Sequence, residues 1–127
     1  MQNKNKKIKI LVIDDDVFFR KIYRDQLTKA GFDFLEATNG VEGIHKIQNE
    51  HPDLILLDLM LPMKNGFEVL KEVKKNPELE KIPIMILSNL GQEQDVKEGM
   101  NLGASGYFVK GETKISEIIK IIKEKIS

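Results

Sequence analysis

The sequence predicts an α/β fold: a doubly wound, five-stranded parallel sheet with helices on both faces. Short apolar runs rich in β-branched residues alternate five times with longer segments whose apolar residues recur at helical spacing. Most of these runs stop abruptly at a charged or hydroxyl residue. Alternation of this kind favours a parallel sheet, because each right-handed crossover returns the chain to the same end of the sheet.

Five runs have the composition of buried strands, namely residues 8–13, 32–37, 54–57, 82–87 and 106–109. The third must end before Pro62, which cannot donate a ladder hydrogen bond. Helical spacing follows each strand, over residues 17–30, around 41–47, and over 66–76, 92–102 and 115–126.

Several residues have a predicted place in these helices. Asp16 is expected to cap the first helix and Gly31 to end it. The segment 92–102, which contains Gly99, has the weakest periodicity. We expect Phe18, Phe19 and the isoleucine stripe of the last helix to belong to the core.

Composition bounds the possible functions. The length of 127 residues predicts one domain spanning residues 1–127, with residues 1–7 as a disordered basic tail. Twenty basic and 20 acidic residues give no net charge, which argues against a binder of nucleic acid that relies on phosphate neutralisation. The absence of cysteine excludes disulfides and thiolate sites and suits a cytoplasmic location. No stretch has the pattern of a signal peptide or membrane span.

Polar residues gather at the carboxyl ends of the predicted strands, where open parallel sheets bind their ligands. They are Asp14, Asp15 and Asp16 after the first strand, Asp58 after the third, Ser88 after the fourth and Lys110 after the fifth. Asp58 emerges from a buried strand, where an unpaired charge is costly. Asp16 is better explained as the helix cap than as a ligand.

This group constrains the chemistry. Clustered carboxylates repel one another unless a cation lies among them. Oxygen ligands without cysteine or a histidine cluster favour Mg²⁺, an ion of phosphoryl chemistry. Asp58 is then a candidate nucleophile that forms an acyl phosphate. Lys110 and the metal would neutralise the phosphoryl oxygens, and the Ser88 hydroxyl would donate a hydrogen bond to one of them.

Four motifs carry a resemblance to a known family. They are Asp14-Asp15 after Ile-Leu-Val-Ile, Leu-Leu-Asp58-Leu-Met-Leu-Pro62 with Gly66 beyond it, Ile-Leu-Ser88, and Gly106-Tyr107-Phe-Val-Lys110. Over about residues 8–126 the sequence resembles the response-regulator receiver domain of two-component phosphorelay systems. That family has a flavodoxin-like, (βα)5 fold.

The resemblance implies a signalling switch, with no enzymatic activity beyond its own phosphorylation and dephosphorylation. Asp58 would accept a phosphoryl group from the phosphohistidine of a sensor histidine kinase or phosphotransfer protein. The implied residues for the chemistry are Asp58, Lys110 and Ser88. The implied ligands of Mg²⁺ (or Mn²⁺) are Asp15, Asp58, the main-chain carbonyl of Met60 and, through water, Asp14. The implied switch pair is Ser88 with Tyr107.

The implied partners are proteins. The face formed by the fourth helix, fifth strand and fifth helix would signal to a downstream protein target. No direct contact with nucleic acid or membrane is expected, and the chain would be a monomer or a phosphorylation-linked homodimer.

Three positions depart from the usual family pattern. Lys110 is followed by Gly111 where the family usually has proline, so we expect a more mobile loop. The position that Met60 occupies is often polar in the family. An apolar side chain there would hinder an attacking water and lengthen the life of the phosphoryl group. Ser88 replaces the more frequent threonine and still supplies a hydroxyl.

Two other functions compete with this interpretation. A haloacid-dehalogenase-type Mg²⁺ phosphatase would use Asp14 as nucleophile in an Asp-x-Asp-x-Thr/Val motif, but Phe18 occupies the last position. A receiver-like scaffold could bind partners without phosphorylation. The chain keeps Asp14, Asp15, Asp58, Ser88 and Lys110, which argues against a receiver that has lost its phosphorylation chemistry.

Overall fold

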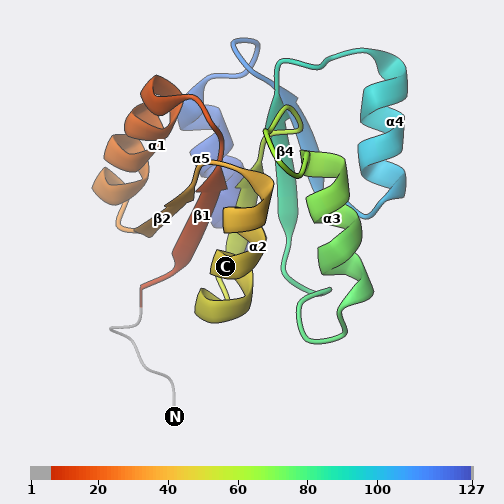
Figure 1. The fold of residues 1–127 in the computed structure, drawn as a ribbon. Coiled ribbons are helices and arrows are strands. Elements are labelled where there is room, and N and C mark those ends of the chain that lie inside the picture. The colour runs from red at the N-terminus through yellow and green to blue at the C-terminus, as the bar shows by residue number, and fades with distance from the viewer. Residues whose placement is uncertain (1–6, 127) are drawn as a thin grey trace.

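The computed structural model describes residues 7–126, which form one five-stranded parallel sheet in the order β2-β1-β3-β4-β5 (Figure 1). Its elements are β1 (Lys9–Ile13), α1 (Val17–Lys29), β2 (Asp33–Ala37), α2 (Gly40–Glu50), β3 (Leu54–Leu57), α3 (Gly66–Lys75), β4 (Ile84–Ser88), α4 (Glu93–Asn101), β5 (Gly106–Val109) and α5 (Ile115–Ile126). The predicted fold class is therefore confirmed. Residues 1–6 of the predicted basic tail lie outside the described part of the chain.

Two cores cover the two faces of the sheet. Because side chains alternate along a strand, Leu11 and Ile13 of β1 join the core under α2 and α3, and Tyr107 packs against its edge near α4. Ile10 and Val12 face the opposite way, into the core under α1 and α5. The sheet is thus covered on both faces, and ligands of sheets of this kind bind outside the carboxyl ends of the strands.

The predicted helix boundaries agree closely with the structure. The Asp16 carboxylate caps α1 by accepting hydrogen bonds from the backbone N–H groups of Phe18 and Phe19. Gly31 follows the helix with a φ of 95°, a left-handed value that suits glycine. Strand β4 begins at Ile84 rather than at residue 82, directly after Pro83, which has no N–H to donate to a ladder.

The expectation that Phe18 belongs to the core is wrong, since 75 % of its surface is exposed. The buried stripe of α1 runs through Phe19, Tyr23 and Leu27, which are spaced four residues apart. Phe18 lies one residue before that stripe, about 100° around the helix, and so faces outward. Two consecutive phenylalanines cannot both face the sheet, and the periodicity of α1 selects the second.

Candidate functional site

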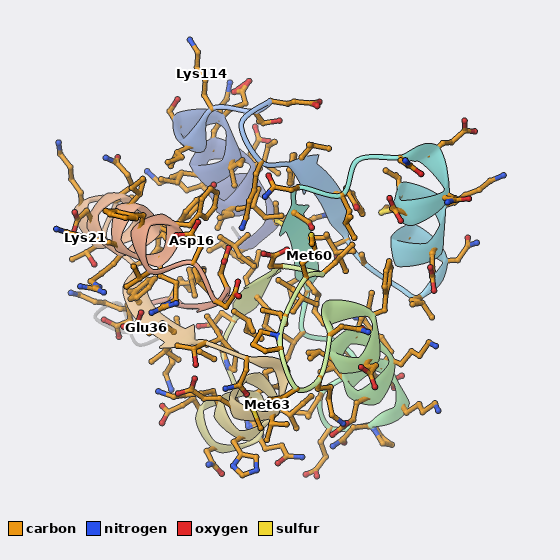
Figure 2. The ribbon with its side chains drawn as sticks, turned by 45° about the horizontal axis from the view of Figure 1, so that its top comes forward. Asp16, Lys21, Glu36, Met60, Met63 and Lys114 are labelled. Carbon is orange, nitrogen blue, oxygen red and sulfur yellow. The ribbon has the colours of Figure 1, made fainter. Side chains whose placement is uncertain are left out.

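The site lies at the switch point between β1 and β3, where the winding of the sheet reverses. Asp14 follows β1, Asp58 follows β3, Ser88 ends β4 and Lys110 follows β5. In the described part of the chain, Asp14, Asp58 and Ser88 are the charged or polar residues classed as buried, with exposures of 2 %, 5 % and 0 %. Figure 2 is turned toward this edge and shows Met60 near its centre, with Asp16 across from it.

Lys110 joins the two buried carboxylates. Its Nζ lies 2.7 Å from Asp14 Oδ2 and 3.0 Å from Asp58 Oδ2, and only 8 % of its side chain is exposed. Burial lowers the pKa of the ammonium, but hydrogen bonds to Asp14 and then Asp58 outweigh it, so the net shift is upward. One cation thereby compensates two carboxylates that would otherwise be costly to bury.

The pKa of the Asp14 carboxyl is shifted as well. Burial raises the pKa of its carboxyl above the ordinary value, and the hydrogen bonds from Lys110 and from the backbone N–H of Asp16 only partly offset this. Its Oδ1 accepts the Asp16 N–H at 2.9 Å while Oδ2 faces Lys110. Both oxygens of Asp14 are therefore already engaged.

A cation fits among the carboxylates. Asp14, Asp15 and Asp58 offer oxygens that all lie within 4.8 Å of one another, and Asp15 is exposed to solvent. Three hard oxygen donors near a surface suit a small hydrated ion such as Mg²⁺. Asp16 stays outside this group, as predicted, because its carboxylate caps α1.

The segment from Asp58 to the start of α3 is tightly packed around the end of β3. The Met60 N–H donates to Asp58 Oδ1 at 3.1 Å, which fixes one carboxylate oxygen. At the start of α3, a Cβ on Gly66 would lie 2.3 Å from the backbone oxygen of Asp58 and 2.6 Å from Leu59 Cα. Glycine is therefore required there for α3 to approach the strand end that carries Asp58.

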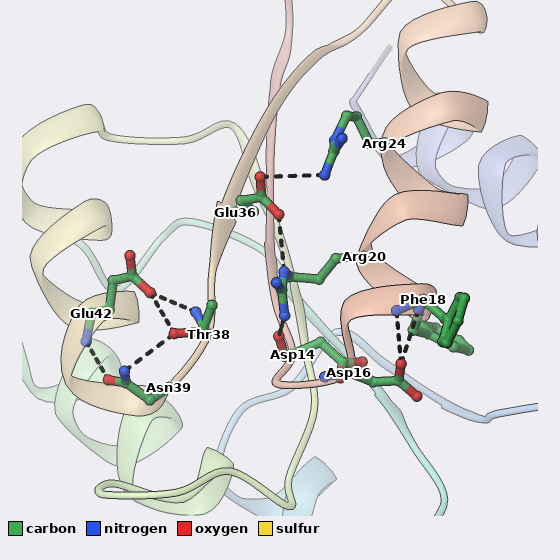
Figure 3. Close-up of polar contacts among 10 residues, drawn as sticks. Asp14, Asp16, Phe18, Arg20, Arg24, Glu36, Thr38, Asn39 and Glu42 are labelled. Atoms are coloured by element: carbon green, nitrogen blue, oxygen red, sulfur yellow. Dashed lines mark hydrogen bonds and ion pairs between the residues drawn. The ribbon is translucent and has the colours of Figure 1, made fainter.

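Arg20 is a structural residue that the sequence did not reveal. Its Nε lies 2.9 Å from Glu36 Oε1, and its Nη1 donates to the backbone oxygen of Asp14 at 2.8 Å (Figure 3). Arg24 adds a second contact to Glu36 at 3.6 Å. Together these contacts tie α1 to β2 and to the backbone of Asp14. The one sequence signal, an arginine a single turn after the cap, is too common to identify this role.

Ser88 and Tyr107 both hydrogen-bond to the backbone of one residue, Leu90. The Ser88 hydroxyl oxygen accepts the N–H of Leu90 at 3.3 Å, and the Tyr107 hydroxyl donates to the carbonyl of Leu90. Burial, followed by the charges of Asp95 and Asp58, raises the pKa of Tyr107 to about 12. The two residues predicted as a switch are thus connected through the β4–α4 loop.

Three further observations concern the backbone and the helices of the described residues. Gly111 adopts a φ of 85°, and no cis peptide bond occurs in the described residues. Across residues 7–126, no helix has the length and apolar character needed to cross a membrane.

Comparison with known proteins identifies the class. The sequence model of the family described as "Response regulator receiver domain" matches residues 10–123, so the chain belongs to this family. It is 41 % identical over 106 residues to "Probable transcriptional regulator ycf27" of Cyanophora paradoxa, covering 84 % of this chain and 43 % of that protein. The chain thus spans less than half of that relative.

Solved structures of receiver proteins have the same fold as this chain. The chemotaxis protein CheY4 of Vibrio cholerae superimposes with a TM-score of 0.86 at 27 % identity, covering 96 % of this chain and all of that one. The BeF3-activated N-terminal receiver domain of RstA from Klebsiella pneumoniae gives 0.86 at 26 % identity, covering 93 % and 97 %. The resemblance read from the sequence motifs is confirmed at the level of family and fold.

Proposed function

We propose that this receiver domain is a phosphorylation-dependent switch that accepts a phosphoryl group on Asp58. The supporting observation is the Lys110 ammonium shared between Asp14 and Asp58 at the switch point of the sheet. A carboxylate oxygen of Asp58 attacks the phosphorus of a phosphohistidine, and the P–N bond breaks. Its electron pair returns to the imidazole of a sensor histidine kinase or phosphotransfer protein, which leaves an acyl phosphate on Asp58.

The acidic group has the donors for Mg²⁺ or Mn²⁺. Asp15, Asp58 and the main-chain carbonyl of Met60 would bind the ion directly, and Asp14 through water. Bound there, the ion would neutralise charge on the phosphoryl oxygens and align them with Asp58. Lys110 would shift from the Asp58 carboxylate to a phosphoryl oxygen, and the Ser88 hydroxyl would donate to another.

The output follows from a population shift. The phosphoryl group favours the conformer in which the Ser88 hydroxyl turns toward it, which releases the Leu90 N–H. Tyr107 contacts the same Leu90 and conveys the change to the face of α4, β5 and α5. A downstream protein would read this face. Three expectations stay predictions. They are the oligomeric state (a monomer or a phosphorylation-linked homodimer), the single-domain boundaries and the cytoplasmic location.

The competing phosphatase interpretation requires Asp14 as nucleophile. It also requires a threonine or valine at the fifth position of the motif, where this chain has Phe18. Turnover of a phosphate ester with label passing through Asp14 would revive that interpretation. The scaffold interpretation requires a receiver that takes no phosphoryl group at all.

Intact-mass spectrometry after incubation with Mg²⁺ and acetyl phosphate tests the proposal. We expect a gain of one phosphoryl group in the wild type and none in Asp58→Asn. Fluoroberyllate should shift the NMR signals of Tyr107 in the wild type only. No mass gain and no change at Tyr107 would refute the phosphoryl switch, and a gain that persists in Asp58→Asn would place the acceptor elsewhere.

A further inference from the structure

The Lys110 ammonium has a third neighbour besides the two carboxylates. Its Nζ lies 4.3 Å from the centroid of the Phe19 ring, over the negative face of the aromatic system. The Phe19 ring is held in turn by Tyr23, which stacks on it with centroids 5.1 Å apart and is itself 1 % exposed. The lysine therefore rests on a fixed aromatic surface provided by α1.

This surface matters because the other partners of the Lys110 ammonium are the carboxylates of Asp14 and Asp58, which take part in the proposed chemistry. The Lys110 N–H donates to the Ser88 carbonyl at 2.9 Å, which anchors the backbone only. Gly111 follows with a φ of 85°, and a Cβ there would meet no atom within 4 Å, so the next residue adds no packing. The four-carbon stem of a lysine is flexible, and its partners decide where the ammonium lies.

The carboxylate partners change during the proposed reaction. Metal binding and phosphorylation both alter the charge and the contacts of Asp58, so its attraction for Lys110 differs from state to state. The ring of Phe19 carries no titratable group and takes no part in these changes. It is therefore a partner whose attraction for the ammonium stays constant throughout.

We infer that Phe19 is a positioning residue for Lys110: its ring face keeps the ammonium beside Asp58 so that Lys110 meets the incoming phosphoryl group. The inference about rate rests on the proposed phosphorylation of Asp58, whereas the contact itself is a property of the protein before any reaction. Phe19 touches neither the donor nor the phosphoryl group and acts only through Lys110.

The chain offers a matched control in the preceding residue. Phe18 has the same chemistry and lies on the same helix, but it is 75 % exposed and faces away from the buried stripe. Phe18→Leu removes a ring from the surface, and Phe19→Leu removes the ring beneath the lysine. Phe19→Tyr keeps an aromatic face and serves as the conservative variant.

The first measurement needs no phosphorylation. The ring current of Phe19 should move the NMR signals of the Lys110 ε-methylene upfield in the wild type, in Phe18→Leu and in Phe19→Tyr. That displacement should disappear in Phe19→Leu. An unchanged Lys110 signal in Phe19→Leu would overturn the inference, whatever the protein does with phosphate.

The second measurement is the rate of phosphorylation by acetyl phosphate at saturating Mg²⁺, with Mg²⁺ affinity measured separately. We expect about a fivefold decrease in Phe19→Leu, the loss typical of one cation–π contact, with Mg²⁺ affinity unchanged. Phe18→Leu and Phe19→Tyr should keep the wild-type rate. If the wild type is phosphorylated and Phe19→Leu is equally fast, the inference fails while the proposed function stands.

Fluorinated phenylalanines at position 19 keep the inference testable if Phe19→Leu does not fold. They weaken the negative face of the ring with little change in its shape, so the rate should fall in steps as fluorine is added. The same series at position 18 should have no effect. A flat series at position 19 in a phosphorylatable protein would mean that the ring only fills space. A wild type that takes no phosphoryl group refutes the proposed function instead, and the Lys110 signals still decide the contact.

Discussion

Two halves of the sheet edge differ in how firmly they are held. The reaction half comprises β1 and β3 with Asp14, Asp58 and the end of Lys110, and β3 is buried along its whole length. The output half comprises β5 and α4 with Tyr107. Every residue of β5 is only partly buried, and Gly99 is the one buried residue of α4.

The difference matches two physical demands. Covalent chemistry needs groups held in one geometry, and burial with paired charges provides that. A switch needs two conformers separated by a small free energy, which calls for elements with little buried surface. The ring of Tyr107 lies close to the backbone of α4, since a Cβ on Gly99 would be 3.3 Å from its Cδ2.

The largest expected effect is that of Lys110→Ala in the reaction half. It leaves Asp14 and Asp58 buried without their shared cation, which should lower the free energy of unfolding by about 3 kcal/mol at neutral pH without metal. Urea unfolding measures this, with the exposed Lys114→Ala as control.

The pH dependence of that loss has a definite sign. Burial already raises the pKa of Asp14, so the folded state binds this proton more tightly than the unfolded state does. Neutralising Asp14 therefore favours the folded state, and its contribution to stability is lost as pH rises through the raised pKa. The destabilisation by Lys110→Ala should shrink as pH falls toward that pKa. An equal loss at neutral and acid pH would show that the lysine stabilises by packing.

Gly66→Ala should have the next largest effect. Its Cβ would overlap the backbone oxygen of Asp58, which cannot move without displacing the end of β3. We expect a loss of about 2 kcal/mol in unfolding free energy and slower phosphorylation. Thermal unfolding and the acetyl phosphate assay measure the two effects. Lys71→Ala, an exposed change on the same helix, should leave both nearly unchanged.

Tyr107→Phe tests the output half. It removes the hydrogen bond to the Leu90 carbonyl and should cost about 1 kcal/mol of stability. Phosphorylation of Asp58 should keep its rate, while the NMR shifts that fluoroberyllate induces in α4 should shrink. A reduced phosphorylation rate would mean that Tyr107, in the output half, also affects the chemistry of the reaction half.

Met60→Asn should have the smallest effect on stability, within about 0.5 kcal/mol, because the Met60 side chain is 55 % exposed. Its expected effect is on the lifetime of the phosphoryl group, which should shorten as a polar chain admits water. Loss of the added mass over time measures the half-life. Met63→Asn, in the same loop, is the control, and an unchanged half-life in Met60→Asn would remove the role given to Met60.

The polar residues at the strand ends could be placed from the sequence because each directly follows or ends a strong apolar run. Asp58, Ser88 and Lys110 needed only the strand pattern and the rule that parallel strands end together. Arg20 and Phe19 could not be found in this way. Their partners, Glu36 and Lys110, lie far along the chain, and neither contact leaves a pattern in the local sequence.

By itself, the sequence determined the winding of the sheet, the edge that carries the chemistry and the carboxylates gathered there, because periodicity and strand ends are local properties. The tertiary structure alone decided that the ring of Phe19 lies against the ammonium of Lys110. It also decided that Ser88 and Tyr107 meet at Leu90. The physical reason is that packing angles and side-chain directions arise only when helices are fixed against the sheet, so contacts between distant segments cannot be read from either segment alone.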